Sequence, residues 1–155
     1  KEQDELVLDV WNGCNKSGHE LLLEVILPES NPDRNEAYYY DMLSHFYSLG
    51  IQPDWWKLPP LSPESWQSIS GLIEQNDPHC RGILLLGLDA PEEKLKAGFA
   101  DAAQAPWVKG FAVGRTIFGQ PSRQWLNGEL DDKTLIETVK GNYLRLIGYW
   151  RAARG

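Results

Sequence analysis

Short apolar segments alternate with longer amphipathic ones along this chain, and this alternation constrains the fold more than any other feature. The apolar segments occupy residues 20–27, 53–58, 82–86 and 108–113. Runs of this length that end at proline or glycine are typical of parallel strands buried on both faces. The amphipathic segments, which predict helices, occupy residues 1–15, 33–49, 62–76, 89–103 and 131–151. Strands that alternate with helices predict an α/β fold with a parallel sheet.

Helix boundary signals agree with this division of the chain. Ser62 followed by Pro63 predicts an N-cap and a first helical residue. Gly50 predicts the left-handed residue that ends a helix. Asp131 or Asp132 predicts the cap of the last helix.

The order of elements is one helix followed by four strand–helix units, which fits an open doubly wound sheet or half of a closed barrel. The first helix has no strand before it, which is unusual in a complete domain and expected of a piece of a longer barrel. Linkers are short and no internal repeat is evident. We therefore predict a single α/β domain over residues 1–155, built as four βα units of a TIM (β/α)8 barrel.

Composition excludes several classes of function. The formal net charge of -7 argues against nucleic acid as a partner, because an acidic surface repels the phosphate backbone. No apolar run reaches the length of a membrane span. Cys14 and Cys80 lie far apart, which fits a reducing compartment and predicts a cytoplasmic protein. The histidines are not spaced as metal ligands, so we predict no metal.

Two ionisable residues interrupt the apolar strands, and chemistry in parallel α/β folds lies at the carboxyl ends of strands. Lys57 stands between Trp56 and Leu58 near the end of one strand. Desolvation favours the neutral amine, which can attack a carbonyl and form a Schiff base. Glu24, on the preceding strand, is the expected partner and a candidate acid/base. The alternatives are a lysine that extends to solvent and a structural ion pair.

Glycines follow the last two strands. Gly87 and Gly114 allow a ligand close to the backbone, and Arg115 adds a forked donor suited to phosphate. This matches the usual phosphate site of barrels, at the last two strands. The alternative is ordinary turn chemistry. Neither turn is a GxGxxG motif or a P-loop, so no nucleotide cofactor is indicated. Asp54, at the start of a strand, is expected to be solvated.

Four sequence motifs resemble a known family. They are HELLLEVILP, PDWWKLPP, RGILLLGLDAPEEKL and WVKGFAVGRTIFGQPSRQWL. In this order and at strand-like spacing, they resemble the second half of the aldolase-like domain at the C-terminus of bacterial 5-dehydro-2-deoxygluconokinases. That domain belongs to inositol catabolism and is similar to the class I tagatose-1,6-bisphosphate aldolases. The resemblance spans nearly the whole chain.

The resemblance implies the C-terminal half of a barrel, with these strands as the fifth to eighth. A D-x-x-K motif in the aldolases supplies the Schiff-base lysine and matches Lys57, while the L-E motif of the preceding strand matches Glu24. The phosphate-binding turns match Gly87 with Leu88 and Gly114 with Arg115. The sequence Gly-Leu-Asp departs from the Ser-Ala-Gly turn usual in the aldolases, so individual phosphate contacts are expected to differ.

The implied activity is that of an aldehyde-lyase without a cofactor. It would cleave 6-phospho-5-dehydro-2-deoxygluconate to dihydroxyacetone phosphate and malonate semialdehyde. The alternatives are a non-catalytic barrel or oligomerisation module attached to a sugar kinase, and a phosphate-binding sugar isomerase or epimerase. Because four strands of the barrel are missing, we expect an uncovered inner face of the sheet, lined by Leu22, Ile26 and Leu85. We therefore also expect self-association or pairing with the complementary half, and an incomplete active site in this chain alone. No membrane partner is expected.

Overall fold

The computed structural model describes residues 2–27, 35–87 and 90–155, and it confirms the predicted alternation of strands and helices. The elements in chain order are α1 (Glu2–Ser17), β1 (Leu22–Glu24), α2 (Ala37–Ser48), β2 (Trp55–Leu58), α3 (Pro63–Asn76), β3 (Gly82–Leu85), α4 (Glu92–Ala102), β4 (Val108–Phe111), α5 (Arg115–Leu126) and α6 (Asp132–Arg154). The strands are shorter than the apolar segments that predicted them.

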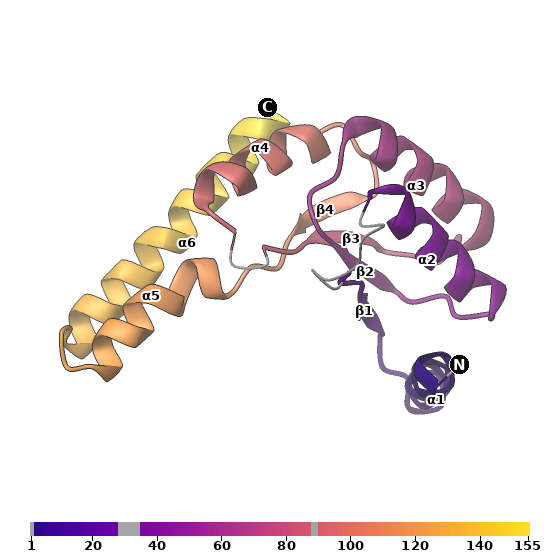
Figure 1. The fold of residues 1–155 in the computed structure, drawn as a ribbon, viewed down its shortest axis with the longest axis horizontal. Helices are drawn as coiled ribbons and strands as arrows, with labels where there is room; N and C mark the ends of the chain where they lie inside the picture. Colours follow the sequence, from indigo (N-terminus) through magenta and orange to yellow (C-terminus); the bar gives the residue numbers. More distant parts are fainter. Residues whose placement is uncertain (1, 28–34, 88–89) are drawn as a thin grey trace.

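The four strands form one parallel sheet in the order β1-β2-β3-β4. Helices α2, α3, α4 and α6 form an arch over one face of this sheet (Figure 1). Right-handed crossovers between successive parallel strands place every helix on the same face as long as the strand order does not reverse. A doubly wound sheet reverses its order and carries helices on both faces. The four described strands show no such reversal, which is consistent with half of a barrel.

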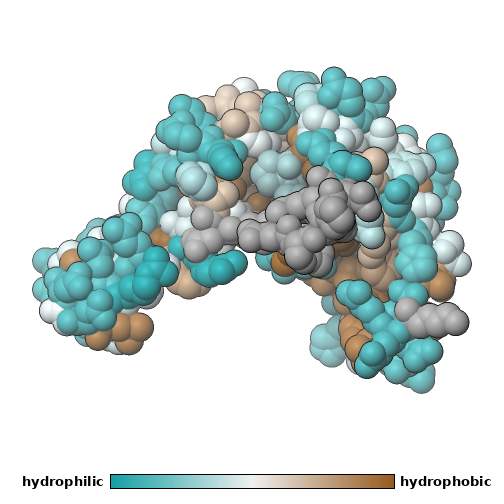
Figure 2. Space-filling model, viewed as in Figure 1, coloured by the Kyte–Doolittle hydropathy of each residue, from teal (hydrophilic) through white to brown (hydrophobic). Residues whose placement is uncertain are grey.

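The hydrophobic core lies between the sheet and the arch of helices. Alternate strand residues point into it, so that Trp56, Leu58, Ile83 and Leu85 are fully buried. Strands alternate their side chains between faces, so the residues in between lie on the opposite face, called here the inner face. Figure 2 shows hydrophobic side chains beneath the arch and at the tip of the α5–α6 hairpin.

One face of the sheet is uncovered, as expected of four strands without the rest of a barrel, so the strands are not buried on both faces. On the inner face Leu22 is 42% exposed and Ile26 50% exposed. Leu85 had also been expected on this face, but it is fully buried in the core, and Leu84 takes its place beside Lys57 in the register. The composition of an apolar run shows that burial is favourable, but not which face has a neighbour.

Helix boundaries follow the predicted caps. Ser62 accepts a hydrogen bond from Ser65 N, and Pro63 is the first residue of α3. Asp131, rather than Asp132, caps α6 by accepting from Thr134 N at 2.7 Å. Gly50 follows α2 with a φ of 76°, the left-handed conformation that glycine adopts without strain.

Helix α5 begins at Arg115, directly after Gly114, and continues through Pro121. Proline has no backbone N–H and leaves the carbonyl four residues earlier without its helical partner. That carbonyl belongs to Ile117, and it accepts a hydrogen bond from Nδ2 of Asn142 on α6 at 2.7 Å. The neighbouring helix therefore supplies the donor that the proline removes.

Membrane insertion finds no support in the helices. Within residues 2–27, 35–87 and 90–155, none of the helices combines the length and the apolar character needed to cross a bilayer.

Candidate functional site

A pocket of about 270 Å³ lies at the carboxyl ends of the strands. It is lined by residues from all four strand ends and the start of α5: Glu24, Ile26, Lys57, Leu86, Gly87, Ala112, Val113, Gly114, Arg115, Thr116 and Phe118. Parallel strands end at the same edge of a sheet, so residues separated by up to 94 positions meet here. All the predicted site residues that the structure describes line this one pocket, and Leu88 lies outside the described residues.

Lys57 and Glu24 form an ion pair at the centre of the pocket. The distance from Lys57 Nζ to Glu24 Oε1 is 2.9 Å. The two residues are direct partners in the register of β1 and β2, which places both side chains on the inner face. The contact predicted from the sequence is therefore present.

The pair is only partly shielded from solvent. The side chain of Lys57 is 21% exposed and that of Glu24 36% exposed. Trp56 and Leu58, expected to enclose Lys57, point into the core on the opposite face. The lysine is thus surrounded by the pocket rather than by its sequence neighbours, and its amine is open to a ligand that enters there.

Arg115 is the second cation of the pocket. It is the first residue of α5, and its side chain is exposed. Among the residues that the structure describes, its guanidinium has no hydrogen-bond or ion-pair partner. The lining residues include one carboxylate against two cations, so the pocket carries a net charge of about +1 on a protein of charge -7. An anionic ligand matches this balance.

The two predicted glycines have packing roles as well. A Cβ atom built on Gly87 would lie 2.9 Å from Val113 Cγ1, and one on Gly114 would lie 3.1 Å from Phe118 Cε1. Both turns are therefore tightly packed against the segment that begins α5. A close turn leaves the pocket lined by backbone, so the packing role and a ligand role are compatible.

Thr116 is a lining residue that the sequence reasoning missed. Its Oγ1 donates to Ala90 O at 3.4 Å, which joins the start of α5 to the segment before α4. A hydroxyl at a helix start is a common phosphate contact. The signal in the sequence was weak, because a single threonine after Arg115 forms no motif of its own.

Asp54 forms part of a polar network at the opposite, amino end of the sheet. Its Oδ2 accepts from Leu21 N at 2.9 Å, and its Oδ1 lies 3.9 Å from Arg81 Nε. Arg81 also bonds Glu20, at 3.0 Å, and Glu20 accepts from Trp55 Nε1 at 2.8 Å. The expectation of a solvated Asp54 was wrong, because its carboxylate binds the backbone at the entry to β1.

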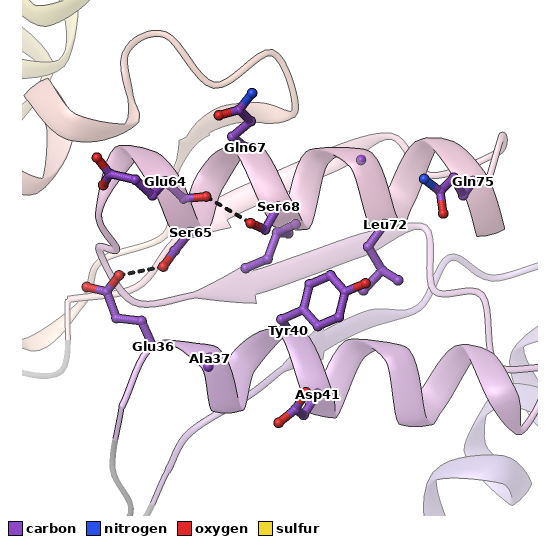
Figure 3. Close-up of a pocket in the computed structure, with 12 residues that line it drawn as sticks. Glu36, Ala37, Tyr40, Asp41, Glu64, Ser65, Gln67, Ser68, Leu72 and Gln75 are labelled. Atoms are coloured by element: carbon purple, nitrogen blue, oxygen red, sulfur yellow. Dashed lines mark hydrogen bonds between the residues drawn. The ribbon is translucent and has the colours of Figure 1, made fainter.

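A second pocket, of about 520 Å³, lies between α2 and α3 (Figure 3). Glu36 points toward the start of α3, where its Oε2 accepts from Ser62 N and from the hydroxyls of Ser62 and Ser65. Burial acts to raise the pKa of Glu36, but these hydrogen bonds outweigh it and hold the pKa below its usual value. The Glu36 carboxylate is thus engaged in joining the two helices.

The described residues offer no metal centre, and the buried thiol of Cys80 is no alternative nucleophile. Across the described ranges, no three His, Cys, Asp or Glu residues gather as metal ligands. Burial raises the pKa of the Cys80 thiol to about 11, which keeps it protonated and unreactive near neutral pH. The pocket at the carboxyl ends is the best supported site.

Comparison with known proteins gives a family but no activity. The family model described as "Uncharacterized protein conserved in bacteria (DUF2090)" matches residues 1–154. None of the curated proteins matches the chain significantly.

Proposed function

The chain belongs to the DUF2090 family, and we propose that it carries the Schiff-base lysine of a class I aldolase acting on a phosphorylated keto-sugar acid. The observation that carries this proposal is the 2.9 Å contact of Lys57 Nζ with Glu24 Oε1, in one pocket with Arg115. A nucleophilic amine, an adjacent acid/base and an anion-binding group are the parts that such a reaction needs.

The two central residues divide the chemistry between them. In the resting pair, Glu24 can accept a proton from the Lys57 ammonium, and the free amine then attacks the ketone carbon of the substrate. Loss of water from the adduct gives a protonated imine. Cleavage of the C–C bond sends its electron pair into the imine to form an enamine, while a base removes the proton of the β-hydroxyl and an aldehyde leaves. Protonation of the enamine and hydrolysis release the ketone product and restore Lys57. Glu24 is placed to carry the protons at Lys57.

The phosphate is assigned to the other side of the pocket. Arg115 offers a planar fork of donors and has no partner among the described residues, and the N-terminus of α5 carries a partial positive charge. Gly87 and Gly114 keep side chains away from this side. Supported by the resemblance, the proposed substrate is 6-phospho-5-dehydro-2-deoxygluconate, cleaved to dihydroxyacetone phosphate and malonate semialdehyde.

The fold proposed for the assembled protein is a (β/α)8 barrel, of which this chain forms four consecutive units. The support is a parallel sheet with unreversed strand order, one layer of helices and a site at the carboxyl ends of the strands. In a closed barrel, the open side of the pocket would face the other four strands. Further acid/base groups would come from there.

Imine trapping tests the proposal. We expect incubation of the assembled barrel with dihydroxyacetone phosphate and borohydride to add the mass of the reduced ligand to the peptide that contains Lys57. Lys57→Ala should lose this adduct, whereas Lys109→Ala, which removes an exposed lysine of β4 bonded to Pro106 O, should keep it. The aldolase mechanism is wrong if no adduct forms at Lys57 and Lys57→Ala retains turnover.

An isomerase is the second candidate, favoured by one feature of the same pair. In the structure the lysine is ion-paired, and a charged ammonium beside a carboxylate could polarise a carbonyl while Glu24 removes a proton. This reaction would proceed without an imine. Trapping therefore separates the two candidates, since only the aldolase gives an adduct at Lys57.

The role of Arg115 makes a separate prediction. Arg115→Ala should weaken binding of a phosphorylated ligand by about 1.5–3 kcal/mol, the scale of hydrogen bonds to charged groups. The unphosphorylated analogue, measured by calorimetry in the same way, should hardly change. Arg123→Ala, which removes another arginine of α5 outside the pocket lining, is the control. Equal losses for both ligands would identify Arg115 as a structural residue.

A further inference from the structure

The contact between Glu24 and Lys57 depends on the register of β1 against β2, and Asp54 holds the start of that register. Both backbone groups of Leu21 are bound there. Its N–H donates to Asp54 Oδ2 at 2.9 Å, and its carbonyl accepts from Trp55 N at 3.0 Å. Leu21 is itself buried, which fixes it further. We call these two bonds the Leu21 clamp.

Because the spacing along the two strands is equal, the pairing fixed at Leu21 also sets which residues pair at the pocket. Three positions separate Leu21 from Glu24, and three separate Asp54 from Lys57. Parallel strands advance at the same rise per residue, so a clamp at one end brings Glu24 level with Lys57 at the other. The observed register has this pairing, and Val25 N continues it by donating to Lys57 O at 3.1 Å.

The apolar pattern of β1 cannot set the register alone. A slip of one residue would turn the buried side chains to the inner face and is therefore strongly disfavoured. A slip of two residues keeps each face apolar, because residues 21, 23, 25 and 27 are all aliphatic, as are residues 22 and 26. It would place Leu22 or Ile26 opposite Lys57 and separate the ion pair. Something other than hydrophobicity must distinguish these registers.

We propose that Asp54 is a positioning residue, whose clamp on Leu21 holds Glu24 against Lys57. Its carboxylate acts three residues away from the amine, through the backbone, and has no contact with the pocket. Its ion pair with Arg81 is long, at 3.9 Å, and Arg81 is exposed, so the hydrogen bond to Leu21 is the main interaction of its side chain. The importance of this role for catalysis rests on the proposed function. The contact between Glu24 and Lys57 is observed in the structure and does not rest on it.

Competitive acetylation of lysines measures the contact without substrate. Loss of the Glu24 carboxylate releases the Lys57 amine from its ion pair, so Glu24→Gln should speed the labelling of Lys57 about twofold to fivefold, the range for partly exposed ion pairs. Asp54→Ala should speed it by a similar factor. In the double variant the two effects should not multiply, because both remove the same contact. Lys133, exposed on α6, is the internal reference.

Two matched variants isolate the clamp. Asp54→Asn keeps an oxygen that can accept from Leu21 N and should label like the parent chain. Glu20→Ala removes the bonds to Arg81 and Trp55 Nε1 but leaves the clamp, so it too should label like the parent. If Asp54→Ala also accelerates the labelling of Lys133, the whole chain has loosened. In that case Asp54→Ser is used in place of Asp54→Ala, and its labelling of Lys57 is compared with that of Glu24→Gln.

The positioning role is overturned if removal of the Asp54 carboxylate lowers the free energy of unfolding but leaves Lys57 labelling unchanged. It is equally overturned if the effects of Asp54 and Glu24 multiply. Either result would make Asp54 a stabilising residue only. Failure of imine trapping would instead reject the aldolase and leave the labelling results as they stand.

Discussion

Trp56→Ala is expected to lower the free energy of unfolding by about 3–5 kcal/mol, the scale of large aromatic deletions in a core. Trp56 is fully buried at the centre of β2, and its Nε1 donates to Tyr47 Oη at 2.9 Å. Its ring contacts Tyr47 edge-on at 5.7 Å between centroids. The variant would lose these contacts and leave the Tyr47 hydroxyl without its donor. Urea denaturation at a fixed protein concentration measures the loss.

Trp125→Ala is the matched control. Trp125 is 41% exposed, and its Nε1 bonds Asp132 at the protein surface, so its replacement should cost about 1 kcal/mol or less. The loss in free energy of unfolding for Trp56→Phe should lie between those of Trp56→Ala and Trp125→Ala, because phenylalanine keeps most of the burial and loses the hydrogen bond. Equal destabilisation by Trp56→Ala and Trp125→Ala would contradict the described core.

The second large effect concerns association. We expect light scattering at micromolar concentration to give a mass well above 17.6 kDa for the isolated chain, or to find the chain bound to a complementary half. Among the described residues, β1 and β4 each pair with one strand only, and unpaired strand edges associate with other strands. The exposed Leu22 and Ile26 add apolar surface on the inner face.

Charged substitutions on the inner face should reverse this association. Leu22→Glu combined with Ile26→Glu should lower the measured mass of the isolated chain, whereas Leu49→Glu, at an exposed apolar position after α2, should not. A compact, cooperatively unfolding monomer of the parent chain would show that the sheet needs no partner, and the half-barrel proposal would then fail.

Most helix and strand boundaries could be predicted from sequence, because the hydrophobic period changes at the positions where proline, glycine and capping residues occur. Ser62 and Asp131 carry the side-chain oxygens that cap helices, and both do so in the structure. The passage of α5 through Pro121 could not be predicted, because a proline inside a helix normally signals a break. The compensating donor, Asn142, lies 25 residues from the carbonyl that it binds. Tertiary contacts of this kind leave no local pattern.

The centre of the candidate site was also predictable, because parallel strands align their carboxyl ends. Two ionisable residues in consecutive strands, Glu24 and Lys57, were therefore expected to meet. The role of Asp54 was hidden, since a carboxylate that binds a backbone N–H looks like a solvated one in sequence. Exposure of the inner face could be expected only from the missing strands of a barrel, because it depends on what lies opposite the sheet and not on the apolar runs themselves.

The helices at the two ends of the sheet limit what can complete it. Helices α2, α3 and α4 each connect two successive strands, while α1 leads into β1 and α6 lies beyond β4. Helix α1 contacts α2 through Asp4 and His45, and α6 packs on β4 through Trp150 and Phe111. An eight-stranded ring has one outer gap between each pair of neighbouring strands. In the proposed barrel, α1 and α6 would occupy the gaps at the two junctions, so the complementary half would need four strands but only three helices. A second copy would bring two helices to each junction and would have to displace one of them.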